Sequence, residues 1–113
     1  MRFDSIIFKE VLITIENDCP AGNMIRVEIP RVSNQEIYEY CMIAYEVGLI
    51  RNISEISSFD GDACFVSNLT LEGTKVLDKL RDEKIWKKVL KKIKETGPMT
   101  LSTLLNFISM IKS

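Results

Sequence analysis

Cysteines are the first residues of this chain to test for chemistry. Cys19, Cys41 and Cys64 lie more than twenty residues apart, and the sequence contains no histidine. A Cys/His zinc site, a Ser-His-Asp or Cys-His nucleophile and a histidine general base each need an imidazole or a Cys-x-x-Cys pair. We therefore expect no metal, no cofactor and no catalytic residue of these kinds, and we interpret the cysteines as reduced core residues.

Carboxylates do not supply a catalytic pair either. Asp78, Asp82 and Glu83 are expected on the outward side of helices, where no apolar pocket surrounds them. Residues 60–62, Asp-Gly-Asp, lack the further carboxylates and the closing glutamate of a calcium loop, and predict a turn. The chain is therefore not expected to be an enzyme.

Charge is divided unevenly along the chain, although the formal net charge is only -1. Residues 1–74 contain five basic and twelve acidic residues, whereas residues 75–113 contain ten basic and four acidic ones. A division of this kind is a hint about partners. Five lysines face away from an apolar stripe of one predicted helix and, with Arg51, form the candidate contact for a polyanion: Lys84, Lys87, Lys88, Lys91 and Lys92.

The elements that must position these residues begin with a helix from Asp4 or Ser5 to about Asn17. Residues 24–29 alternate apolar and charged side chains before Pro30, which predicts a short, half-buried strand. A second helix follows over about residues 34–47. It starts at a capping box formed by Ser33 and Glu36 and ends at Gly48.

Two further strands are expected over about residues 49–56 and 63–69, joined at a hairpin tip that the Asp60-Gly61 step favours. Thr70 begins a third helix, and Asp82 is placed to cap a fourth that carries an apolar stripe of Trp86, Val89, Leu90 and Ile93. Residues 97–98, Gly-Pro, break the chain, and a last helix runs from Thr100 to about Ile111.

This order predicts an α+β fold: a winged helix-turn-helix-like domain with a small antiparallel sheet and a wing, followed by a C-terminal helical extension. The usual middle helix is reduced to a turn at residues 30–32. A chain of 113 residues is about one domain long, with residues 1–80 as the winged-helix core and 81–113 as the C-terminal helices. No apolar run is long enough to cross a membrane and no signal pattern follows Met1, so we expect a cytoplasmic protein.

The second helix is the one that would read DNA in a winged helix, but its polar stripe is Glu36, Glu39, Ile43 and Glu46, without Lys or Arg. Such a face repels phosphates. Two interpretations remain for its apolar residues. The helix is buried centrally between the first helix, the sheet and the C-terminal helices, or Tyr38, Met42 and Tyr45 form a protein-contact patch at four- and three-residue spacing.

The lysines of the fourth helix leave two interpretations besides a solvated face. They could bind nucleic acid weakly and without sequence preference, because lysine lacks the guanidinium fork that reads guanine. They could instead dock against an acidic surface, such as the second helix of another copy. The last helix is apolar on more than one face, which suggests a homodimer through that helix.

Residues 68–89 carry a family resemblance. They are similar to the pattern L-T-x-x-G-x-x-x-L-D-x-(I/L)-R-(D/N)-x-x-(I/V)-W of the domain of unknown function 2513 family, small proteins often found in bacterial phages and prophages. The Gly48-Leu49-Ile50 step resembles the entry into the wing of small winged-helix proteins. At Cys41-Met42 the chain departs from the family pattern, where a histidine is common. Trp86 is kept, and is expected to pack the C-terminal helices on the core.

What the resemblance implies is a winged-helix-like fold in a bacterial or phage setting, without an activity to transfer. From the residues we expect a non-catalytic module that binds another macromolecule, most simply a protein. The alternative is a DNA-binding transcriptional regulator, which the fold favours and the acidic second helix opposes.

Overall fold

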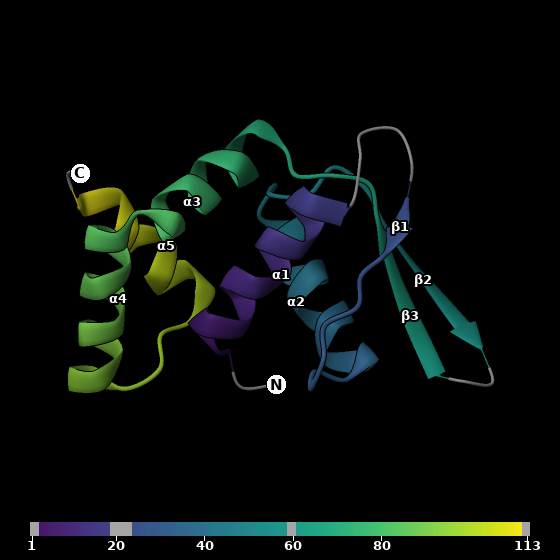
Figure 1. Ribbon diagram of the computed structural model, residues 1–113, viewed down its shortest axis with the longest axis horizontal. Helices are drawn as coiled ribbons and strands as arrows, with labels where there is room; N and C mark the ends of the chain where they lie inside the picture. Colours follow the sequence, from purple (N-terminus) through teal and green to yellow (C-terminus); the bar gives the residue numbers. More distant parts are fainter. Residues whose placement is uncertain (1–2, 19–23, 59–60, 112–113) are drawn as a thin grey trace.

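The computed structural model describes residues 3–18, 24–58 and 61–111. Over these residues the chain has an α+β fold with five helices and one three-stranded antiparallel sheet, which confirms the predicted class. The elements are α1 (Ser5–Asp18), β1 (Ile25–Arg26), α2 (Asn34–Glu46), β2 (Ile53–Ser58), β3 (Gly61–Val66), α3 (Leu71–Arg81), α4 (Glu83–Thr96) and α5 (Leu101–Met110). In Figure 1 the sheet lies at one end of the molecule, α4 and α5 at the other, and α1 and α2 between them.

Helix starts follow the capping side chains in the sequence. Asp4 caps α1, since its Oδ1 accepts a hydrogen bond from the Ile6 N–H at 2.8 Å. The remaining helices begin at side-chain caps, each of which accepts a backbone hydrogen bond from the first turn. Ser33, Thr70 and Asp82 are the predicted caps, whereas Thr100 was expected only as the start of the last helix. These contacts satisfy N–H groups that a helix leaves without intrahelical partners.

The end of α2 is a Schellman turn at Gly48. Gly48 has a φ of 83°, its N–H donates to the Tyr45 carbonyl at 3.0 Å, and the Leu49 N–H donates to the Ala44 carbonyl at 2.8 Å. The left-handed conformation suits glycine because it has no Cβ. The turn sends the chain toward the sheet at the residue where the sequence places the helix end.

Strand β3 is the centre of the sheet, which has the order β1-β3-β2. The expectation of a strand over residues 24–29 was too long, because only Ile25 and Arg26 pair in register, with Val66 and Phe65. The Val27 N–H still donates to the Cys64 carbonyl at 2.9 Å. The chain then turns at Pro30, which leaves no length for further pairing.

The hairpin is shifted toward its tip relative to the expected strands. β2 and β3 pair from Ile53 with Val66 to Ser58 with Gly61, and an isolated bridge joins Ile50 to Leu69. The first strand was predicted to begin at residue 49, next to this bridge, and the second to end at residue 69, within it. Both of these residues lie outside the ladder. Gly61 of the expected Asp60-Gly61 tip already pairs with Ser58 in the ladder, and the connecting residues 59–60 lie outside the described residues.

The core lies between the helices and one face of the sheet. Phe8, Val11, Leu12 and Ile15 of α1 are buried at the three- and four-residue spacing read from the sequence. Cys41 and Cys64 are buried as well, which agrees with their interpretation as core residues, and Cys19 lies outside the described residues.

Helix α2 contacts β3, β2 and α1, whereas α3, α4 and α5 pack on one another and α3 also packs on α1. The expected burial of α2 therefore comes mainly from α1 and the sheet.

Candidate functional site

Helix α2 carries the first candidate surface. Its buried side chains are Ile37, Tyr40, Cys41 and Ala44, which recur on one side of the helix. Tyr38, Met42 and Tyr45 lie together on the neighbouring flank. Tyr38 and Met42 are half-buried, and Tyr45 is 44% exposed. The structure therefore groups the three predicted contact residues and leaves Tyr45 as the most accessible of them.

The outward side of α2 is acidic, as its sequence predicts. We call Glu36, Glu39, Ile43 and Glu46 the acidic stripe. Glu36 and Glu46 are exposed, Glu39 and Ile43 are half-buried, and within the described part of the chain none of the three glutamates forms an ion pair. The stripe is therefore a negative surface without internal compensation.

Tyr40 lies on the buried side of α2, and the negative charge of the acidic stripe affects its pKa. Burial raises the pKa of its phenol above 10, and the hydrogen bond from the Asp4 N–H at 2.8 Å opposes that rise. The carboxylates of Asp4, Glu36 and Glu39 raise the pKa further, because a second negative charge beside them is unfavourable. The phenol therefore stays neutral and acts as a hydrogen-bond acceptor that fixes the start of α1.

Helix α4 carries the second candidate surface. Ile85 and Val89 are buried, and Lys84, Lys87, Lys88 and Lys91 are exposed on the other side. Lys92 is half-buried, so it is less accessible to a polyanion than the other four lysines of the predicted contact. The structure adds a lysine that the prediction did not include, the exposed Lys94.

Two further residues depart from the expected arrangement. Leu90, predicted for the apolar stripe of α4, is 38% exposed because it lies at the edge of a cavity. Arg51 is exposed, and its N–H donates to the Asn68 carbonyl at 2.9 Å, just ahead of β2. Since α4 and the sheet lie at opposite ends of the molecule in Figure 1, the structure does not bring Arg51 together with the lysines.

Trp86 joins the C-terminal helices to α1. Its ring is half-buried, and the Lys9 ammonium lies 4.2 Å from the ring centroid in a cation–π contact. Burial lowers the pKa of Lys9, and the positive charge of Arg81 lowers it further. Arg81 in turn pairs with Glu16 at 2.7 Å. These contacts agree with the expected anchoring role of Trp86.

Helix α5 leaves apolar surface uncovered. Leu101, Leu104 and Ile108 are buried, whereas Met110 is 74% exposed. A groove of about 520 Å³ runs beside the helix and is lined by apolar side chains and by charged residues of α3: Val47, Leu49, Val76, Leu105, Ile108, Glu72, Lys75, Asp78 and Lys79. The surplus apolar surface expected from the sequence is present, and the homodimer that it suggests stays a prediction.

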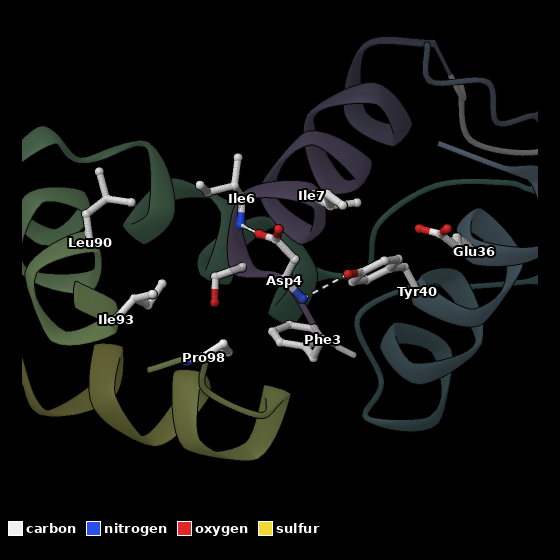
Figure 2. A pocket seen from close by; sticks show the side chains of 10 residues that line it. Phe3, Asp4, Ile6, Ile7, Glu36, Tyr40, Leu90, Ile93 and Pro98 are labelled. Carbon is white, nitrogen blue, oxygen red and sulfur yellow. Dashed lines mark hydrogen bonds between the residues drawn. The ribbon is translucent and has the colours of Figure 1, made fainter. Parts of the chain in front are cut away.

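A cavity at the start of α1 was not predicted. It has a volume of about 380 Å³, and Figure 2 shows Leu90 and Ile93 of α4 on one side of Asp4 and Tyr40 and Glu36 of α2 on the other. Ser5 lines the cavity, is 2% exposed, and its Oγ has no hydrogen-bond partner. In the sequence, Ser5 follows the capping Asp4 and could equally be taken as the cap of α1. Its position therefore gave no clear signal of a cavity.

Over the described residues, no group of three or more cysteine or carboxylate side chains is placed to hold a metal ion. No helix in that part of the chain is long and apolar enough to cross a membrane. The candidate surfaces are two oppositely charged helix faces, an apolar flank and a groove.

Comparison with known proteins gives a family match. Residues 3–99 match the model of a family described as hypothetical protein (DUF2513), a description that states no activity. The chain matches no curated protein and no solved structure.

Proposed function

The chain belongs to the DUF2513 family, since the family model covers most of its length, and we propose that it is a non-catalytic protein-binding module with a winged-helix fold. The resemblance adds a bacterial cytoplasmic setting, often in phages or prophages, as part of this proposal.

The strand topology supports the winged-helix assignment. Strand β1, between α1 and α2, pairs with β3, the second strand of the hairpin, and β2–β3 then corresponds to the wing. A turn stands in place of the middle helix. Its Arg31 has a φ of 72°, and its Val32 N–H donates to the Ile29 carbonyl at 3.2 Å. This order is the one expected of a winged helix that has lost its short middle helix.

The acidic outward face of α2 is the single observation that carries the protein-binding proposal. In a DNA-binding winged helix the helix at this position enters the major groove, next to phosphates. Here Glu36, Glu39 and Glu46 occupy that side. A glutamate accepts from cytosine only where neighbouring cations hold the backbone, and α2 contains no Lys or Arg. The partly exposed flank with Tyr45 instead has the aromatic character of a protein interface.

A DNA-binding regulator remains the second candidate function. The exposed lysines of α4 support it, together with the winged-helix topology. Binding through these lysines would be electrostatic and independent of sequence, and would lie at the far end of the molecule from the wing. A winged-helix regulator instead reads DNA through the helix in the position of α2. We therefore rank DNA binding as the second candidate function.

A salt series separates the two functions. We would titrate a labelled random DNA duplex with the purified protein and measure fluorescence anisotropy, starting at low salt. The protein-binding proposal expects no saturable binding. Tight binding that falls steeply with salt and is abolished in the Lys87→Glu, Lys88→Glu, Lys91→Glu variant would overturn it in favour of the regulator.

The positive test compares surfaces in one capture experiment. Wild type, Tyr45→Ala and the triple lysine variant are immobilised, and bound proteins are identified in an extract of the source organism. A specific partner should be retained by wild type and by the lysine variant and lost with Tyr45→Ala, while circular dichroism shows unchanged folding. A partner that binds the Tyr45→Ala variant as well as wild type would contradict a contact through α2.

A further inference from the structure

Two helix faces of this protein share one spacing and carry opposite charges. The acidic stripe on α2 occupies positions 36, 39, 43 and 46, with intervals of three, four and three residues. On α4 the exposed Lys84, Lys87, Lys91 and Lys94, which we call the lysine stripe, repeat the same intervals. Such intervals keep side chains on one face of a helix, and each stripe spans about 15 Å along its axis.

The charges of both stripes remain available for an external contact. The glutamates of the acidic stripe form no ion pair within the described residues. Among the lysines of the lysine stripe the structure shows one pair, in which Lys91 lies 4.0 Å from Glu95 with both side chains well exposed. Lys84, Lys87 and Lys94 have no acidic partner over the part of the chain that is described.

The two stripes of one molecule do not meet. In both figures α1 lies between α4 and α2. The lysine stripe also lies opposite Ile85 and Val89, the side of α4 that packs on the protein. A second copy, however, offers each stripe a surface of matching length, spacing and opposite sign.

We propose that the acidic stripe on α2 of one copy binds the lysine stripe on α4 of a second copy. This inference rests on the proposed function, because it names a partner for α2. Intervals of three, four and three read the same in both directions, so parallel and antiparallel helices each place three glutamates opposite three lysines. Ile43 then faces the remaining lysine, whose aliphatic stem can cover it.

The physical character of this contact is electrostatic. Exposed ion pairs are weak one at a time and are screened over about 10 Å at roughly 0.1 M salt. The contact is therefore weak, seen at high protein concentration, and lost with added salt. An association through the apolar surface of α5 would show the opposite response, because salt does not screen hydrophobic burial.

Sedimentation velocity over a concentration series, at roughly 20 mM and roughly 500 mM sodium chloride, tests the proposal. Wild type should associate at low salt and dissociate at high salt. Glu39→Lys with Glu46→Lys should weaken association about tenfold or more, because like charges then face each other. Glu28→Lys with Glu72→Lys is the matched control, since both side chains are well exposed and lie outside the stripes, and the change in net charge is the same.

Rescue by charge exchange identifies the pairing. A mixture of the Glu39→Lys, Glu46→Lys variant with a Lys87→Glu, Lys94→Glu variant should associate again if the helices run parallel. A Lys84→Glu, Lys91→Glu variant should rescue instead if they run antiparallel. Circular dichroism confirms that each variant is folded.

Three results would overturn the proposal: a monomer at every concentration at low salt, association that resists salt, or reversal variants that neither mixture rescues. None of them would remove the proposed function, which is tested separately by capture of another protein through Tyr45. Conversely, if that capture failed, the charge-exchange rescue would still test the proposal, because it is measured separately by sedimentation.

Discussion

Gly73→Ala is a substitution for which local propensity and packing predict opposite results. Gly73 is buried in the first turn of α3. A Cβ at this position would overlap the carbonyl oxygen of Leu49, and would lie 3.0 Å from the Leu49 carbonyl carbon and 3.2 Å from the Leu69 Cβ. The obstruction is backbone, so it cannot move aside as a flexible side chain would. The same carbonyl accepts the Thr70 N–H at 2.9 Å.

The expected effect follows from three contributions. Replacing glycine by alanine inside a helix gains about 1 kcal/mol. Overpacking against a fixed backbone costs about 1–3 kcal/mol, and weakening the Thr70–Leu49 hydrogen bond costs about 1 kcal/mol more. The sum is a loss of about 2 kcal/mol, which for a domain of this size lowers the melting temperature by roughly 8 °C.

Urea unfolding followed by Trp86 fluorescence and by circular dichroism measures this loss. The control is Asn106→Ala on the exposed side of α5, where alanine gains helix propensity without a clash. If Gly73→Ala instead stabilises the protein as much as the control does, α3 does not approach the Leu49 backbone as closely as described. The packing argument would then be refuted.

Two further substitutions test the start of α1. Ser5→Ala should stabilise the protein by about 1 kcal/mol, because it removes a buried hydroxyl without a partner, and a loss of stability in thermal unfolding would show that the hydroxyl is bonded. Tyr40→Phe should cost about 1 kcal/mol at neutral pH, since the Asp4 N–H loses its acceptor. Because the folded-state pKa of Tyr40 is raised above 10, its stabilising contribution is present below pH 10 and is lost as the pH rises through that higher value. The stability difference between wild type and Tyr40→Phe should therefore shrink in alkaline solution, and a constant difference in urea unfolding at increasing pH would contradict this.

Local signals determined most of the helix boundaries. Ser33, Thr70 and Asp82 cap the helices that the sequence assigned to them, because a side-chain cap acts within its own first turn. Strand lengths were less predictable. The apolar alternation around β1 extends over six residues, but pairing requires a partner strand, and that partner is set by the tertiary fold.

The candidate surfaces were partly predictable for the same reason. Periodicity placed the lysines of α4 opposite an apolar stripe that includes the buried Val89, and the glutamates of α2 away from its core side. It could not show that Arg51 lies at the other end of the molecule. The cavity beside Ser5 was also beyond the sequence, since its walls come from α1, α2 and α4 together.

The residues that carry the family resemblance build one structural junction. The Thr70 hydroxyl caps α3 and donates to the Gly48 carbonyl, and Gly73 lets α3 lie on Leu49. Further along the pattern, Asp82 caps α4 and Trp86 packs under Lys9. The pattern therefore specifies how the sheet half of the molecule is joined to the C-terminal helices.

The charges that we propose to bind a partner occupy other positions. Within residues 68–89, Lys84 stands where the pattern accepts any residue, and Lys87 follows Trp86, the last residue of the pattern. Glu39, Glu46, Lys91 and Lys94 lie outside these residues. The pattern thus describes the scaffold and does not specify the stripes. Charge reversal in the stripes leaves the junction intact, so a change in association can be assigned to the surface and not to the fold.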